Sequence, residues 1–177
     1  MGKKSRDKGN RFERTIAKKF SEVFNMNIRR VPASGGLDIK SDVYCPEDDR
    51  FPYFIECKNR ASFRVDSLFS GSSAVYDFLC TALQHSEDAW VQDKYGIRQV
   101  PIVVFTGGNF NLHYVVMLSK DVDRVFTSVT LPSPYFSIGL YLVIELGVFL
   151  TNCNKKLLDD QEIIIDFTLL QEDDGEC

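Results

Sequence analysis

Two short strand-like runs separated by a polar turn constrain the fold of this chain more than any other feature. Residues 39–45 and 53–58 contain β-branched and aromatic side chains, and residues 46–50 between them are polar and turn-forming. The pattern predicts a β-hairpin with a long loop. Side chains alternate between the faces of a strand, so Glu56 and Lys58 point the same way, roughly 7 Å apart along the second strand.

The length of the turn sets which residues face each other across this hairpin. Opposed residues in an antiparallel hairpin have numbers with a constant sum, so a turn centred near Asp49 places Asp42 opposite Glu56. The Cβ atoms of such a pair lie roughly 5 Å apart. Asp38 is the alternative to Asp42, and it needs a turn centred near Glu47, two residues earlier. We prefer Asp42 because of this register.

Asp42 and Glu56 would be two close carboxylates, which repel each other and cost stability unless a cation lies between them. Magnesium takes oxygen ligands and keeps several waters, which suits these carboxylates, a phosphate oxygen and the backbone carbonyl of Cys57. Lys58 then stabilises phosphorane charge or orients the attacking water, while the metal supplies Lewis acidity. The competing interpretation is an exposed carboxylate of Glu56 paired with Lys58. We therefore predict a Mg²⁺-dependent phosphodiesterase site in which Mn²⁺ can substitute.

The segment before the hairpin predicts a helix over residues 10–24, capped by Asn10. Apolar side chains repeat every four residues from Phe12 to Phe20, which is helical spacing. Residues 1–9 ahead of this helix are basic and polar, and we expect them to form a flexible arm.

The segments after the hairpin complete a mixed α/β (α+β) fold. We predict a second helix and several strands, at residues 72–90 for the helix and at 100–105, 112–118, 136–149 (one strand, or two split near Gly139 or Gly147) and 162–170 for the strands. The order helix, hairpin, helix, strand, strand predicts a central mixed sheet flanked by helices. The domain organisation is a single domain with a flexible arm (1–9), a catalytic core (10–118), a C-terminal β-rich extension (119–170) and an acidic tail (171–177).

Charge is distributed unevenly along the chain. The formal net charge of −4 hides ten Lys and Arg against three acidic residues in 1–30, and two Lys against eight acidic residues in 154–177. The basic arm is therefore a candidate phosphate-contacting surface. The alternative is a frayed, solvated end with no partner.

The cysteines and the apolar segments bear on the compartment. The five cysteines lack zinc-site spacing and fit reduced thiols. The first twenty residues lack the apolar core of a signal peptide, and residues 135–150 are too short and too interrupted for a membrane span. We expect a cytoplasmic protein of a bacterial, phage-infected or archaeal cell, without membrane partners.

The sequence Ile55-Glu56-Cys57-Lys58, preceded by Ser41-Asp42, resembles the PD-(D/E)XK signature with Ser41 in place of the proline. A helix bearing Glu13, followed by Arg29-Arg30 and a Ser/Gly-rich loop, resembles the archaeal-type and phage Holliday junction resolvases. The resemblance covers about residues 8–118. The tripeptide Glu-x-Lys is weak alone and gains specificity from the upstream aspartate, the preceding helix and the following helix–strand–strand. The resemblance implies a restriction-endonuclease-like core and a metal-dependent DNA endonuclease.

The resemblance also extends the site. In those resolvases an N-terminal helix supplies a third carboxylate, which corresponds to Glu13, although a first-turn glutamate can equally be a helix-dipole partner. The predicted catalytic residues are Glu13, Asp42, Glu56 and Lys58, and the predicted metal ligands are Asp42, Glu56, Glu13 and the carbonyl of Cys57. The predicted DNA contacts are Lys3, Lys4, Arg6, Lys8, Arg11, Arg29, Arg30, Ser34, Asn59, Arg60 and Arg64. Surface solvation is the competing account for these contacts, and a simple turn role competes for Ser34.

Three other polar residues received a structural interpretation. Gln84 and His85 lie on the second helix, where some branches of the superfamily approach the site, but a solvated helix face is the preferred account. His113 alternates along a strand and is interpreted as structural.

The resemblance implies a substrate and an assembly as well. Resolvases act as homodimers on branched DNA and leave a 3′-hydroxyl and a 5′-phosphate. Residues 135–150 carry more apolar side chains than one small sheet needs, so we assign them to a dimer interface or to partner-covered sheet edges. The alternatives are a phage or mobile-element endonuclease or exonuclease on linear or flapped DNA, and a non-catalytic DNA-binding module on the same fold. An RNA nuclease is disfavoured because nothing resembles an aromatic RNA-stacking platform.

Overall fold

The computed structural model describes residues 3–32, 39–48, 51–60, 74–91, 98–107, 112–126, 135–138 and 140–155. Its helices are α1 (Lys3–Phe24), α2 (Ala74–Val91), α3 (Val122–Val125) and α4 (Leu146–Asn152), with a 3-10 turn η2 (Ser119–Asp121). Its strands are β1 (Arg29–Arg30), β2 (Val43–Tyr44), β3 (Tyr53–Arg60), β4 (Val100–Gly107), β5 (His113–Leu118), β6 (Tyr135–Ile138) and β7 (Tyr141–Glu145).

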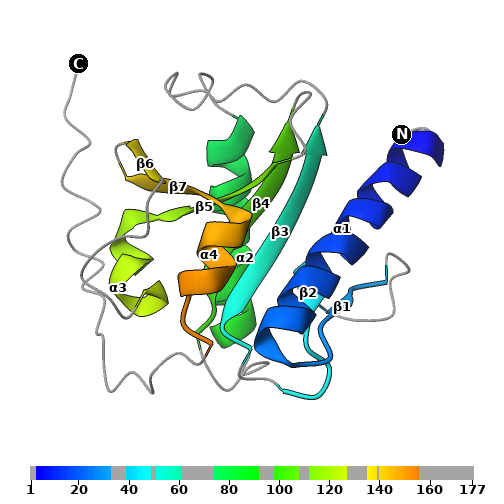
Figure 1. Cartoon of the computed structure of the whole chain (residues 1–177), viewed down its shortest axis with the longest axis horizontal. Helices are drawn as coiled ribbons and strands as arrows, with labels where there is room; N and C mark the ends of the chain where they lie inside the picture. Colours follow the sequence, from blue (N-terminus) through cyan, green and yellow to red (C-terminus); the bar gives the residue numbers. More distant parts are fainter. Residues whose placement is uncertain are drawn as a thin grey trace.

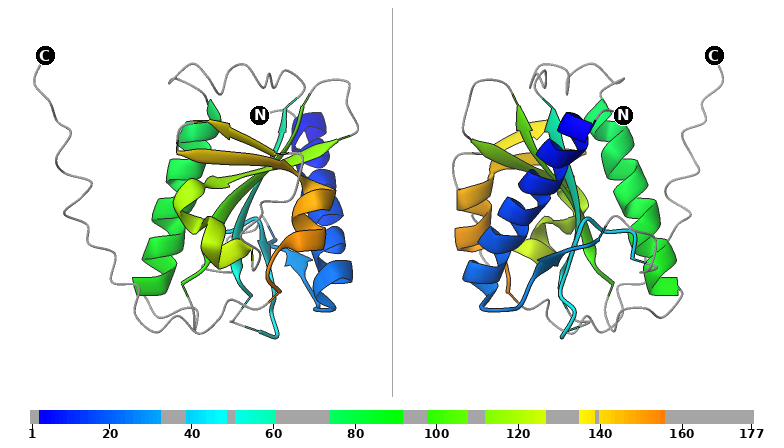
Figure 2. Two further views of the ribbon diagram at one scale, coloured as in Figure 1. Left: turned by 60° about the vertical axis from the view of Figure 1, so that its left-hand side comes forward. Right: turned by 90° about the vertical axis from the view of Figure 1, so that its right-hand side faces the viewer.

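The described strands form one mixed sheet in the order β1-β2-β3-β4-β5-β7-β6. Strands β3 and β4 are parallel, joined through α2, and the other neighbouring pairs among the described strands are antiparallel. Helices α1 and α4 cover one face of the sheet and α2 covers the other (Figures 1 and 2). The predicted fold class, a mixed sheet flanked by helices, is confirmed.

The core divides between these two faces. The larger cluster lies under α1 and α4, where Phe20, Tyr53 and Phe149 are fully buried and pack ring against ring. A smaller cluster under α2 includes Leu79 and Phe105. Aromatic packing of this kind fixes the angle of α1 against β3, and β3 is the strand that carries the predicted Glu-x-Lys pair.

Helix α1 begins at Lys3, so the predicted start at Asn10 was wrong and residues 3–9, predicted as a flexible arm, belong to the helix. Phe12 and Phe20 are buried as the helical spacing predicts. Lys and Arg are good helix formers, so the segment extends the helix without a break. The Asn10 side chain does not cap the helix; it accepts a hydrogen bond from the guanidinium of Arg30, at 2.8 Å.

The hairpin forms with the predicted register. Val43 pairs with Ile55, which gives the constant sum expected for a turn centred at residue 49. The first strand is shorter than predicted, since β2 contains only two residues of the range 39–45. Its other edge pairs with β1, a strand that the sequence analysis did not predict. The helix and the two strands predicted at 72–90, 100–105 and 112–118 are confirmed as α2, β4 and β5.

The last third of the chain continues the same sheet. The run 136–149 forms two strands, β6 and β7, as one of the two predicted options, but residues 146–149 belong to α4 and their assignment to a strand was wrong. The carboxylate of Glu145 accepts a hydrogen bond from the amide of Val148, at 2.9 Å, and caps α4. The apolar spacing of this helix buries Leu146 and Phe149. The strand predicted at 162–170 lies outside the described residues.

Most apolar side chains of residues 135–150 are buried within one chain, including Leu142, Ile144 and Phe149. They complete the core, so the predicted excess of apolar surface is largely absent among the described positions. Tyr135 and Leu140 are the exceptions and are exposed. None of the described helices combines the length and the apolar character needed to cross a membrane.

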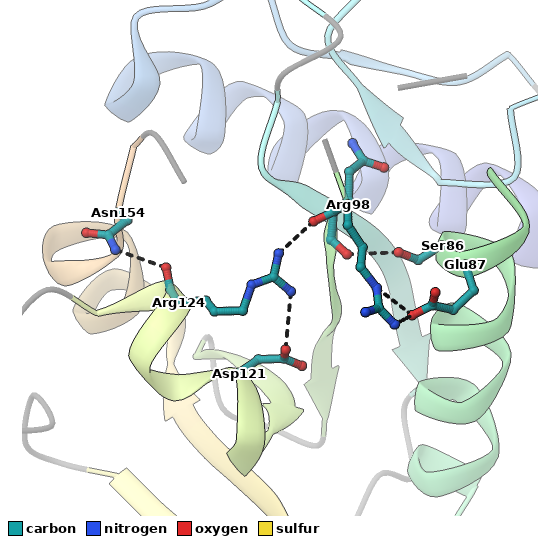
Figure 3. Close-up of polar contacts among 7 residues, drawn as sticks. Ser86, Glu87, Arg98, Asp121, Arg124 and Asn154 are labelled. Atoms are coloured by element: carbon teal, nitrogen blue, oxygen red, sulfur yellow. Dashed lines mark hydrogen bonds and ion pairs between the residues drawn. The ribbon is translucent and has the colours of Figure 1, made fainter. Parts of the chain in front are cut away.

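Polar contacts hold α3 and the end of α4 against the sheet, at the base of β4 (Figure 3). Arg124 donates a hydrogen bond to the carbonyl of Arg98, at 2.9 Å, and lies 3.5 Å from the Asp121 carboxylate. Arg98 in turn pairs with Glu87 of α2. Asn154 donates to the carbonyl of Arg124, at 2.9 Å. These contacts tie both faces of the sheet together at the start of β4, where Val100 pairs with Tyr53 of β3.

Candidate active site

The hairpin brings the predicted Asp42, Glu56 and Lys58 to one place. The register of Val43 with Ile55 puts Asp42 opposite Glu56 on β3. The backbone amide of Asp42 donates to the carbonyl of Ile55 at 2.9 Å, and the Asp42 Oδ2 atom accepts from the backbone amide of Cys57 at 2.7 Å. The Asp42 carboxylate is therefore anchored on the strand between Glu56 and Lys58.

Ser41, at the position where the motif has proline, fixes the chain just before Asp42. It is buried, and its Oγ atom accepts from the backbone amide of Ile55 at 3.2 Å and donates to the carbonyl of Val43 at 2.6 Å. The hydroxyl thus replaces a backbone ladder contact where β2 leaves the regular sheet. Sequence reasoning missed this role, because it treated the residue only as a departure from the motif.

Asp42 is held in an unfavourable electrostatic environment for a charged carboxylate. Burial, followed by the charge of Glu56, raises its pKa from 3.8 to about 7, with a further contribution from Glu13. The hydrogen bond from Cys57 and the charge of Lys58 act in the opposite direction but do not compensate. A cluster of carboxylates of this kind favours a cation.

Lys58 lies beside the carboxylate pair and is itself restrained. Its ammonium forms an ion pair with Glu56, and the two side chains are 28% and 14% exposed. The same ammonium lies 4.5 Å from the centre of the Phe78 ring, on α2. The ion pair of the competing interpretation therefore forms, but its Glu56 carboxylate is not exposed as that interpretation expects.

Glu13 projects from α1 near this group but is paired elsewhere. Its Oε2 atom accepts from the Nε atom of Arg30 at 2.5 Å, and both side chains are largely shielded from solvent. The same guanidinium donates to Asn10, one helical turn before Glu13. The charge of Glu13 reaches Asp42. Within the described part of the chain, no three His, Cys, Asp or Glu side chains are already arranged to hold a metal ion.

In the structure the guanidinium of Arg30 holds Glu13 and Asn10, and its use as a phosphate contact stays a prediction. Part of this cluster could have been predicted from the sequence. Asn10 and Glu13 are three residues apart, which places them side by side on one face of a helix. The partner on β1 could not be found that way, because a contact between α1 and β1 depends on the tertiary fold.

The other predicted DNA contacts lie in several settings. The exposed ones on α1 are Lys4, Arg6, Lys8 and Arg11. Arg29 is exposed and its Nε atom donates to Asn27 at 2.8 Å, while Asn59 is half-buried on β3. Lys3 and Arg60 lie in α1 and β3, and the positions outside the described residues are Ser34, Arg64 and the alternative ligand Asp38.

The three polar residues given a structural interpretation differ in their surroundings. Gln84 is exposed on α2, and His85 is half-buried with its ring 6.4 Å from that of Phe54. The ring of His113 meets that of Phe12 edge-on at 5.3 Å, and burial lowers the pKa of His113. Packing of this kind supports a structural role for His113, whereas His85 is less solvated than predicted.

Comparison with known protein families gives a match over most of the chain. A family model described as "Phage putative PDDEXK endonuclease" matches residues 4–156, which span α1 to α4 and include every strand of the sheet. No curated protein and no solved structure gives a significant match. The matched region contains the Asp42, Glu56 and Lys58 cluster described above. The chain belongs to this phage PD-(D/E)XK endonuclease family and is a nuclease.

Proposed function

We propose that this nuclease hydrolyses phosphodiester bonds of DNA with a magnesium ion held between Asp42 and Glu56. One observation carries the proposal: the hairpin places the Asp42 carboxylate on the Cys57 amide and opposite Glu56, and burial together with the charge of Glu56 raises the pKa of Asp42 to about 7. This placement disfavours the charged form of Asp42, so stability alone does not account for it. A divalent cation reverses the repulsion between Asp42 and Glu56.

The residues present fit magnesium. Carboxylate oxygens and a backbone carbonyl are the hard ligands that Mg²⁺ prefers, and Asp42, Glu56 and the carbonyl of Cys57 supply them. Glu13 is close enough to influence Asp42 electrostatically and is the proposed third carboxylate. When bound, the ion would supply Lewis acidity and a lowered water pKa.

The chain's own groups have separable tasks in this proposal. The ammonium of Lys58 donates a hydrogen bond to the attacking water or to a phosphate oxygen, and it neutralises charge that develops on the phosphoryl group. Arg30 and Asn10 orient Glu13 toward the site through their shared hydrogen bonds. Water attacks phosphorus in line, the bond to the 3′ oxygen breaks, and the products carry a 3′-hydroxyl and a 5′-phosphate.

For the substrate we propose branched DNA of the Holliday junction type. The support is the resemblance of the Glu13 helix and the hairpin to junction resolvases, together with a basic face on α1. Lys4, Lys8 and Arg11 are exposed on the helix that also carries Glu13, so duplex phosphates bound there would lie next to the site. A resolvase needs two such sites, and the exposed Tyr135 and Leu140 support a homodimer through this end of the sheet.

The experiment is a cleavage assay on a synthetic four-way junction and on its separate linear arms. The purified chain should cut in Mg²⁺ or Mn²⁺, and neither in EDTA nor in Ca²⁺. Asp42→Asn, Glu56→Gln and Lys58→Ala should abolish cleavage and keep DNA binding. Glu22→Gln is the matched control, since that carboxylate is 62% exposed on α1 and should not affect the rate.

Each outcome of this assay has a distinct meaning. Full activity in Glu56→Gln would end the proposed mechanism. Equal cleavage of the junction and its arms would favour an endonuclease or exonuclease on linear or flapped DNA. Salt-sensitive binding without cleavage in any metal would favour a binding module. A monomer in light scattering at all concentrations would contradict the resolvase assignment.

A further inference from the structure

We propose that Phe78 is a positioning residue for Lys58, holding the lysine ammonium against the face of its ring; this rests on the proposed function of Lys58. Phe78 lies within the helix predicted at residues 72–90. In the structure the Lys58 Nζ atom lies 4.5 Å from the ring centre, within the range of a cation–π interaction.

The ring is well placed to act as a fixed platform. Phe78 comes from α2 and packs on the cluster of buried side chains beneath that helix, which includes Leu79 and Phe105. Phe105 is the register partner of Lys58 on β4, and its ring stacks on that of Tyr114 at 5.6 Å. The platform under the lysine is therefore built from two strands and a helix.

A lysine needs such a platform more than an arginine would. Its four-carbon stem has many rotamers, and fixing them costs conformational entropy. The ion pair with Glu56 restrains the ammonium. Glu56 is also a proposed metal ligand, and a carboxylate that binds a metal attracts a neighbouring ammonium less strongly. A phenyl ring does not bind Mg²⁺ as a carboxylate does, so binding of the metal would leave the contact between the Phe78 ring and the ammonium in place.

The first test replaces Phe78 in the full chain by phenylalanines with one, two and three ring fluorines. Fluorine withdraws the charge from the ring face while the size of the side chain hardly changes. We expect kcat to fall progressively, by about two- to thirty-fold over the series, with KM for DNA unchanged. Phe78→Tyr should keep the wild-type kcat, and Phe78→Leu should match the trifluorinated variant. The same series at Phe54, a buried ring of β3 next to His85, is the control and should leave kcat unchanged.

A purely structural role for Phe78 predicts a flat fluorine series, because packing does not sense the ring's charge distribution. A flat series in a chain that cuts DNA would overturn the positioning role and leave the proposed function intact. The reverse case, a chain that cuts none of the DNAs, would end the proposed function and with it a catalytic purpose for this contact.

The second test decides the contact without cleavage. A double-mutant cycle of Lys58→Met and Phe78→Leu on urea unfolding measures the coupling between the ammonium and the ring. Methionine keeps an apolar stem and removes the charge. We expect the unfolding equilibrium constant of the double variant to differ from the additive value by about two- to five-fold. Additive effects would overturn the proposal whatever the assay on DNA gives.

Discussion

Replacing Asp42 by asparagine should stabilise the folded chain at alkaline pH. Burial and Glu56 raise the pKa of Asp42 from 3.8 to about 7, and each pKa unit corresponds to about 1.4 kcal/mol of folding free energy. Ionised Asp42 therefore costs the fold about 4 kcal/mol when the pH is well above 7. Asparagine is nearly isosteric, cannot ionise, and its Oδ1 atom can still accept the hydrogen bond from Cys57.

The sign of the pH dependence follows from the raised pKa. The stability that Asp42 contributes is fully present below pH 4, where the carboxyl is protonated in folded and unfolded chains, and it is lost as the pH rises through 7. The stability of Asp42→Asn relative to the wild type should accordingly rise from pH 4 to pH 8, to at most about 4 kcal/mol. A carboxylate with an ordinary structural role predicts the opposite trend.

Urea unfolding in EDTA at several pH values from 4 to 8 measures this difference. Asp88→Asn is the matched control, because Asp88 is exposed on α2 and should show no pH-dependent difference from the wild type. Adding Mg²⁺ at pH 8 should stabilise the wild type and not Asp42→Asn. A variant that is less stable than the wild type at pH 8 would refute the electrostatic reasoning.

Three further predictions concern Glu56, Arg30 and Arg124. Glu56→Gln should lower the pKa of Asp42, as an NMR titration of the Asp42 carboxyl carbon in EDTA will show; an unchanged pKa would separate the two carboxylates. Arg30→Met should reduce kcat about ten- to hundred-fold with little change in DNA affinity, because Glu13 loses its orienting partner; a loss of affinity alone would make Arg30 a phosphate contact. Arg124→Met should lower the free energy of unfolding at pH 8 by about 3 kcal/mol in urea titrations, because the buried Asp121 carboxylate loses its ion-pair partner; wild-type stability would show that the contacts of Arg124 in Figure 3 are dispensable.

The register at the centre of the site could be predicted because it depends on local geometry. A turn centred at residue 49 requires Asp42 to face Glu56, and the observed pair of Val43 with Ile55 has that register. The spacing of Glu56 and Lys58 follows from the alternation of a strand. The grouping of Asp42, Glu56 and Lys58 could therefore be predicted from the sequence alone.

Elements whose structure depends on partners far away in the sequence could not be predicted in this way. Strand β1 has only two residues, both arginines, and it is a strand because it pairs with β2. The pairing of Arg30 with Glu13 needs that strand to lie against α1, so the sequence alone did not indicate this contact. Residues 146–149 of α4 were predicted as a strand because they are apolar, and the contact that decides for a helix is the cap that Glu145 supplies.

The central claim is that Asp42 and Glu56 share one divalent cation, and anomalous diffraction from a crystal soaked in Mn²⁺ tests it most directly. The account predicts an anomalous peak within coordination distance of both carboxylates and of the Cys57 carbonyl, absent in Asp42→Asn. Crystals whose manganese lies elsewhere, or the same peak in Asp42→Asn, would contradict it.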